Sequence, residues 1–276
     1  MNKNDLTELS ITADDGAQLN VVTAGPSGGE PVVLIHGHGA EHGMWNPQLE
    51  RYAREGYYLI APDMRGHGKS APALRIEAGD WAEDLYCILR HLAIDQVHLI
   101  GVSMGGIIAG EFTCRYPAAV RSLILSDSFG KLRGIKETAL GTAFLLSFRF
   151  LRLLPRSKLA DYYGGAYDFP GGEKAAQYFR DAAMRIDFRQ LAATRRAINR
   201  IDTEERLSRY AGPSLVMVGT RPGELFVNMS HRLANALGTQ AVLLEGALDP
   251  SNLTAAEQFD RRVLAFLASA GRESTL

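Results

Sequence analysis

The chain has 276 residues, 46% of them hydrophobic, which is enough to bury a sizeable core in one α/β domain with an insertion. Its formal net charge of −1 excludes a strong field of one sign that would attract nucleic acid or an anionic membrane. Two cysteines in no metal-type spacing (Cys87 and Cys114) and a polar N-terminus without an apolar signal core predict a reducing, cytoplasmic location.

The first half of the chain alternates between strand and helix patterns. A hairpin is predicted over residues 8–22, with Asp14-Asp15-Gly16 at its turn. Buried strands are predicted at 31–35, 57–61, 97–100 and 120–125, with helices at about 45–55, 79–91 and 104–116. Such alternation predicts a mostly parallel sheet with helices on both faces.

The alternation stops between residues 130 and 206. This segment contains helical stretches and a Gly/Tyr/Pro loop from Tyr162 to Gly172, and its apolar run is interrupted by Arg149 and Arg152, so it is too charged to span a bilayer. Strands resume at 214–218 and 241–244, with helices at 228–237 and 254–269. We predict a core of residues 1–129 and 207–276 and a helical cap of residues 130–206 over the sheet's carboxyl edge. An ordinary helical excursion is the alternative.

The run from Val97 to Gly106 contains the main chemical signal. It reads as a short apolar strand, a glycine-flanked turn with Ser103 at its tip, and a helix. This geometry lifts a hydroxyl out of the sheet into a cleft. A serine placed in this way is a weak nucleophile unless a base activates it, usually a histidine held by a carboxylate.

Three motifs in order resemble those of the α/β-hydrolase superfamily over nearly the whole chain: His36-Gly37-His38-Gly39, then Asp63-Met64-Arg65-Gly66-His67-Gly68-Lys69-Ser70, then the serine turn. The resemblance implies an eight-stranded, mostly parallel sheet. It also implies an oxyanion hole made by the backbone amides of His38 and Met104, in the loop that contains Gly37. His36 and His67 are expected to stabilise turns.

The chain departs from the family at the two other triad positions. Pro222 stands where relatives have the aspartate, and Glu224 follows two residues later. Asp249 stands where relatives have the histidine, and His231 belongs to the surface of the preceding helix. The triad is therefore degenerate, with Ser103 kept and no histidine in the expected place.

The candidate catalytic residues are Ser103, Asp249, Asp127 and Glu224, and the candidate oxyanion or substrate-binding residues are His38, Met104, His42 and Gly37. Asp249 with its ordinary pKa of about 3.9 is a poor base towards an alcohol, but it can take a proton from carbon next to a carbonyl. Asp127 follows a strand from which some family members draw their acid. Its alternative role is to cap the following turn.

Three functions fit these residues. The first is an enzyme that acts on a carbonyl-bearing, largely apolar small molecule by elimination, cyclisation or carbon–carbon bond change. The second is an ester or lactone hydrolase with a relocated histidine (His38 or His42) and Glu224 or Asp127 as its acid. The third is a binding protein without catalysis, whose cap residues contact a hydrophobic ligand. The six cap residues are Phe144, Leu145, Leu146, Phe148, Phe150 and Leu151. No metal or cofactor is expected, and a homodimer is left open.

Overall fold

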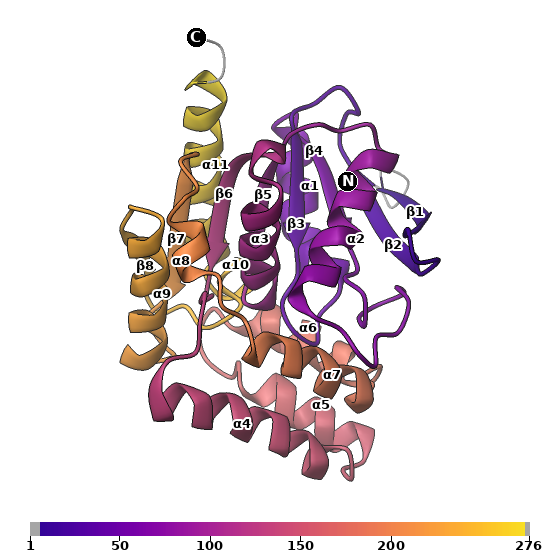
Figure 1. Cartoon of the computed structure of the whole chain (residues 1–276). Helices are drawn as coiled ribbons and strands as arrows, with labels where there is room; N and C mark the ends of the chain where they lie inside the picture. The colour runs from indigo at the N-terminus through magenta and orange to yellow at the C-terminus, as the bar shows by residue number, and fades with distance from the viewer. Residues whose placement is uncertain (1–5, 274–276) are drawn as a thin grey trace.

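The computed structural model describes residues 6–273, and it is built around one sheet of eight strands (Figure 1). The strands are β1 (Leu6–Thr12), β2 (Gln18–Ala24), β3 (Pro31–Ile35), β4 (Tyr58–Pro62), β5 (Val97–Val102), β6 (Val120–Ser126), β7 (Ser214–Gly219) and β8 (Ala241–Leu244). Their spatial order is β1-β2-β4-β3-β5-β6-β7-β8. Among the described strands only the β1–β2 and β2–β4 pairs are antiparallel, so β2 alone runs against the others and the sheet is mostly parallel, as predicted.

Helices cover both faces of the sheet, and each face has its own buried core. One face packs against α2 (Ala78–His91), α3 (Met104–Arg115) and α9 (Glu224–Ala236). The other packs against α1 (Asn46–Arg54) and α11 (Ala256–Glu273). The short helices are η2 (His42–Trp45), η3 (Pro117–Ala119), α8 (Glu204–Leu207) and α10 (Ser251–Thr254). Because the central strands are buried on both faces, they read as continuous apolar runs in the sequence.

Four helices between β6 and β7 lie beyond the carboxyl ends of the strands (Figure 1). They are α4 (Gly134–Leu151), α5 (Arg156–Gly165), α6 (Glu173–Ala183) and α7 (Phe188–Asn199). They share a small core of their own that includes Phe148, Leu159 and Leu191. Of the six apolar residues proposed to contact a ligand, only Phe148 is buried, and Phe150 is 73% exposed. These six side chains therefore do not form one continuous buried wall.

Every predicted strand is present to within two residues, but three helix boundaries were wrong. Tyr162–Gly165, predicted as loop, forms the last turn of α5, because Gly164 has no side chain to obstruct the close approach of Arg180 from α6. The helix predicted at 228 begins at Glu224, directly after Gly223 with its φ of 89°. The predicted C-terminal helix is divided into α10 and α11.

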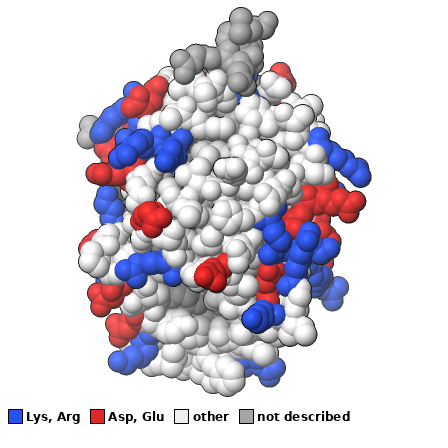
Figure 2. Space-filling model, turned by 90° about the vertical axis from the view of Figure 1, so that its left-hand side faces the viewer, with Lys and Arg blue, Asp and Glu red and all other residues white. Residues whose placement is uncertain are grey.

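Charged residues are mixed rather than segregated by sign on the face seen in Figure 2, the left-hand side of Figure 1 where β8 and α9 lie. Acidic and basic side chains alternate along its margins, with uncharged surface between them. Among residues 6–273, no helix is long and apolar enough to cross a bilayer.

Candidate active site

Ser103 lies at a strained turn between β5 and α3. Its backbone has φ 57° and ψ −118°, a conformation that costs a non-glycine residue about 1–3 kcal/mol. The neighbouring glycines make the turn possible. A Cβ on Gly101 would lie 2.2 Å from the carbonyl oxygen of Gly105, and a Cβ on Gly105 would lie 2.0 Å from that of Ile35. The surrounding packing therefore holds the serine in place.

Two backbone amides beside the serine have no hydrogen-bond partner anywhere in residues 6–273. They belong to His38, in the loop after β3, and to Met104, the first residue of α3. A Cβ on Gly37 would meet Cβ of Ser103 at 3.5 Å, so this loop passes directly beside the serine. Free amides in this position are suited to hold an oxygen that gains negative charge.

The side chain of His38 is turned away from the serine. Its Nε2 lies 3.1 Å from the Leu191 carbonyl oxygen and 3.0 Å from Thr194 Oγ1, both on α7. Burial lowers the pKa of His38 to about 3, so the ring is neutral. His38 is therefore not a relocated base for Ser103, and its ring connects the loop after β3 to α7.

A carboxyl group lies beside the Ser103 hydroxyl. The Asp249 side chain, which follows β8 at the position where the family resemblance places histidine, is close enough to Ser103 for the hydroxyl to lower its pKa. Burial and the nearby Asp127 carboxylate raise the pKa of Asp249 to about 8, although Ser103 and Arg195 act in the opposite direction. At neutral pH Asp249 consequently holds a proton that it can exchange, as an imidazole does.

Asp127 is the second carboxyl group of the site, at the end of β6, with φ 51°. Its Oδ1 accepts the amide of Gly219 at 2.9 Å, and its Oδ2 accepts the amide of Ser251 at 2.8 Å. These bonds join β7 and α10 and do not cap the turn after β6. Burial raises the pKa of Asp127, but the two amides stabilise its charge. Of the two neighbouring groups, Asp249 is therefore the one that keeps the shared proton.

A small cavity of about 10 Å³ borders both aspartates. That volume is close to the minimum for one water molecule. Pro222, at the family's acid position, lines this cavity with Phe226 and Met229. An apolar side chain therefore borders the cavity at the position where relatives have the acid.

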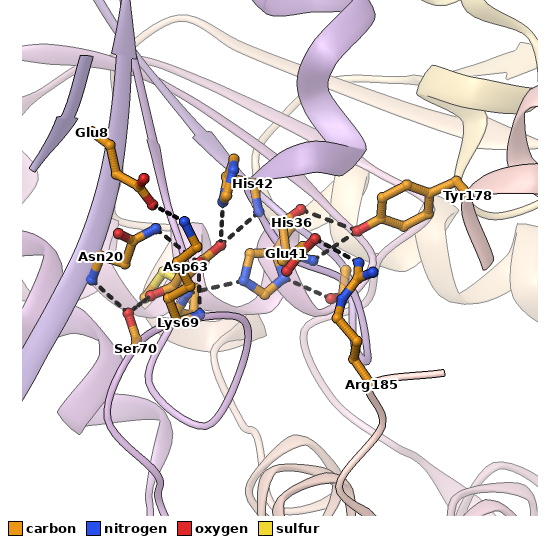
Figure 3. Close-up of polar contacts among 12 residues, drawn as sticks. Glu8, Asn20, His36, Glu41, His42, Asp63, Lys69, Ser70, Tyr178 and Arg185 are labelled. Atoms are coloured by element: carbon orange, nitrogen blue, oxygen red, sulfur yellow. Dashed lines mark hydrogen bonds and ion pairs between the residues drawn. The ribbon is translucent and has the colours of Figure 1, made fainter. Parts of the chain in front are cut away.

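Two of the residues predicted for the site lie elsewhere. Glu224 is exposed in the first turn of α9, where a negative charge suits the helix dipole, and it has no described contact with Ser103 or Asp249. His42 begins η2 and pairs with Asp63, with 2.8 Å between Nδ1 and Oδ1 (Figure 3). The structure therefore brings together Ser103, Asp127 and Asp249, without Glu224 or His42.

His36 has the structural role expected of it. Its Nδ1 lies 2.8 Å from the carbonyl oxygen of Gly37, and its Nε2 accepts the amide of Met64 at 2.9 Å. These two bonds tie the loop after β3 to the loop after β4.

Two residues of the helical insertion reach Asp249 and were missed by the sequence analysis. The Tyr167 hydroxyl donates to the Asp249 carbonyl oxygen at 2.9 Å. The Arg195 guanidinium, whose pKa burial lowers to about 10, stabilises the charged form of the Asp249 carboxyl group. No sequence signal could find them, because their distance along the chain from Asp249 follows no motif.

Comparisons with known proteins agree with this geometry. The family model described as alpha/beta hydrolase fold matches residues 30–164. A hydrolase from Pseudomonas aeruginosa has a TM-score of 0.81 at 24% identity and covers 96% of this chain and 99% of its own. The chain has the α/β-hydrolase fold. An enol-lactonase from Burkholderia xenovorans shares this fold, with a TM-score of 0.81 at 22% identity over 94% of this chain and 100% of its own.

Two curated relatives match most of the chain. The (E)-2-((N-methylformamido)methylene)succinate hydrolase of Acinetobacter baylyi is 28% identical over 87% of this chain and 90% of its own. The 3-oxoadipate enol-lactonase 1 of the same species is 25% identical over 79% of this chain and 80% of its own. The first is named as a hydrolase and the second as a lactonase.

Proposed function

We propose that the chain is an enzyme that acts on a carbonyl-bearing, largely apolar small molecule, with Asp249 as the general acid and base in place of an imidazole. One observation carries this proposal: Ser103 lies next to two unpaired amides and near the carboxyl group of Asp249, whose pKa is raised to about 8. A group with a pKa near the working pH is suited to both accept and return a proton.

The first candidate reaction is non-hydrolytic. The substrate's carbonyl oxygen lies between the amides of His38 and Met104, and ionised Asp249 takes a proton from the adjacent carbon. The electron pair moves to the oxygen, which becomes an enolate held by the amides, each worth about 2.7–4 kcal/mol. Protonated Asp249 then returns the proton to a leaving group or to another atom, which completes an elimination, cyclisation or carbon–carbon bond change.

The second candidate is hydrolysis of an ester or lactone, and the curated relatives favour it because both are named as hydrolytic enzymes. In this reaction ionised Asp249 takes the proton of Ser103, whose oxygen attacks the carbonyl carbon. Protonated Asp249 then gives its proton to the leaving alcohol, and water cleaves the acyl-serine. This route differs from our earlier hydrolase hypothesis, because its base is Asp249 instead of His38 or His42.

Proton NMR in D₂O tests both candidates in one sample. Wild-type protein is incubated with β-keto esters and with simple esters and lactones. Exchange of the protons next to the carbonyl, or formation of an acid, is then followed over time. Ser103→Ala separates the reactions: proton exchange persists in the non-hydrolytic reaction, whereas acid formation through Ser103 stops.

Fluorophosphonate labelling adds an independent measurement. Rapid labelling of Ser103 supports the hydrolase, and absence of labelling with continued proton exchange supports the non-hydrolytic reaction. If the protein binds these compounds tightly but neither exchanges nor converts them, the proposal of an enzyme fails and a binding protein remains.

A further inference from the structure

A cavity of about 600 Å³ lies apart from the serine, between the loops after β3 and β4 and the α6–α7 segment. Its lining includes Glu41, His42, His67, Lys69, Arg185 and Gln190. Ser103, Asp127 and Asp249 do not line it. A cavity of this size lies within the range that takes a small organic ligand.

His42 is held in the wall of this cavity by Asp63 (Figure 3). Its Nδ1 lies 2.8 Å from Asp63 Oδ1, and its own backbone amide donates to the same oxygen at 2.8 Å. Asp63 Oδ2 accepts the Lys69 amide at 2.9 Å and the Asn20 side chain at 3.0 Å. The ring is therefore fixed with Nδ1 as the donor to Asp63.

The other ring nitrogen of His42 is unused. Within residues 6–273, Nε2 has no hydrogen-bond partner, and the side chain remains 19% exposed. Pairing with Asp63 outweighs burial and raises the pKa of His42, so at neutral pH both nitrogens carry a hydrogen more often than in a free histidine. Nε2 then serves as a charged donor at the cavity wall.

The two carboxylates at the cavity are each paired through one oxygen. Glu41 Oε1 accepts Arg185 at 2.8 Å (Figure 3), Asp187 Oδ1 accepts the Arg189 amide at 2.7 Å, and the second oxygen of each has no partner in the described chain. By contrast, Gln190 uses only its oxygen, which accepts the Ala73 amide at 2.6 Å, and its NH₂ group has no partner in the described chain. His42 Nε2 and the Gln190 NH₂ group are thus donors without a partner in the described chain, and both suit a ligand with acceptor oxygens.

His67 gives a second, independent indication of a ligand. It lines the same cavity and is 6% exposed, yet neither ring nitrogen makes a well-formed hydrogen bond within residues 6–273. The Arg65 carbonyl is close enough to raise its pKa slightly, but not in hydrogen-bonding geometry, and burial lowers this pKa far more. A buried polar group without a partner is rare and calls for an explanation.

We propose that this cavity binds a small carboxylate, which accepts a hydrogen bond from His42 Nε2, with Asp63 as the positioning residue. A charge-assisted bond of this type is about twice as strong as a neutral one. The Gln190 NH₂ group supplies a second donor. This site is separate from the Ser103 site and does not depend on the proposed function.

Succinate is the probe for the test, and the protein carries ¹³C at Cε1 of its seven histidines. We expect one resonance, absent in His42→Asn, to shift on titration and to saturate at about 10 mM or below. By calorimetry, His42→Asn should weaken succinate binding by about tenfold or more, the cost of a lost bond to a charged group. His91→Asn, a matched change at an exposed residue of α2, should leave the affinity unchanged.

Two further measurements keep the test decisive. Succinamide has the same shape without charge and should bind at least about tenfold more weakly. If His42→Asn does not fold, the Gln190 NH₂ signal of the wild type should shift with the same dissociation constant as the histidine. Asp249→Asn should retain succinate binding, which separates this site from the failure or success of the proposed enzyme. Equal affinity in folded His42→Asn, equal affinity for succinamide, or no saturable shift up to about 50 mM would overturn the proposal.

Discussion

Asp249 and Asp63 are the same residue type in two neighbouring regions, and their surroundings shift their pKa values in opposite directions. Asp63 accepts bonds from His42, Lys69 and Asn20, which hold its pKa well below the usual range despite burial. Asp249 is buried and lies near a second carboxylate, so its pKa is raised to about 8 although the Ser103 hydroxyl lowers it. The charge and hydrogen bonds of its neighbours decide whether a buried aspartate stays ionised and holds another residue in place or keeps a proton that it can donate.

The comparison also shows how the parts of a serine-hydrolase triad are distributed in this chain. Ser103 and two free amides lie in one region, with two aspartates and no imidazole. A histidine held by a carboxylate lies in the other region, at the cavity that includes His42. The two regions are joined by the loop from Gly37 to His42, yet within residues 6–273 no hydrogen bond joins His42 or Asp63 to Ser103, Asp127 or Asp249. We therefore expect substitutions in one region to leave the other intact.

The largest predicted effect is that of Asp249→Asn on turnover. An amide cannot accept and return a proton, and loss of a general acid–base group costs about 10²–10⁴ in rate. The conversion rate of whichever carbonyl compound proves to be a substrate is the measurement. Asp95→Asn, at an exposed aspartate between α2 and β5, is the matched control. Undiminished turnover in Asp249→Asn would remove Asp249 from the mechanism.

The next effect is that of Asp127→Asn, which removes the second negative charge. We expect the pKa of Asp249 to fall below its wild-type value of about 8, because the repulsion from Asp127 disappears. We also expect a loss of about 1–3 kcal/mol in stability, since an amide cannot accept both the Gly219 and the Ser251 amides. Carboxyl ¹³C titration measures the pKa, and urea unfolding measures the stability. An unchanged Asp249 titration would show that the two carboxyl groups do not interact.

The pH dependence of stability gives a third and smaller effect. Asp249 titrates near 3.9 in an unfolded chain and near 8 in the folded one, so the folded chain binds the extra proton between these values. Its contribution to stability is present below about pH 4 and is lost as the pH rises towards 8.

Thermal unfolding measures this contribution. Between pH 4 and pH 8.5, the Tm of the wild type should fall relative to that of Asp249→Asn by at least about 2–4 °C, which corresponds to about 1 kcal/mol. Asp95→Asn should follow the wild type. Parallel curves for wild type and Asp249→Asn would mean that the folded pKa of Asp249 is ordinary.

The sequence predicted the sheet and the turn at Ser103 because both depend on local patterns. Continuous apolar runs mark strands buried on both faces, and the glycines around Ser103 are needed wherever backbone passes backbone at close range. The position of Asp249 after β8 followed from the family register. That register could not give its pKa, which depends on Asp127 from another strand and on removal from water.

The sequence also did not show which partner each histidine would find. The sequence suggested Glu224 or Asp127 as the carboxylate that would pair with His42. The structure pairs His42 with Asp63, the first residue of the second family motif. His38 was a candidate for substrate binding or for the relocated base, yet α7 of the insertion supplies the partners of its ring. Contacts between the insertion and the loops after β3 and β4 join segments far apart in the chain, and neither periodicity nor spacing encodes them. For the same reason, the sequence could not predict that Tyr167 and Arg195 interact with Asp249.

The smallest predicted effect is that of Glu224→Gln. This substitution tests whether a carboxylate outside the two regions contributes to turnover. Glu224 is exposed at the start of α9, where its charge should stabilise the helix by only about 0.3–1 kcal/mol. We expect unchanged turnover and a Tm shift near the limit of measurement. A tenfold or greater loss of turnover would mean that the Pro222–Gly223 turn rearranges to bring Glu224 to the serine. The Asp127–Asp249 pair would then lose its place as the complete acid–base unit, because a third carboxylate would share the proton.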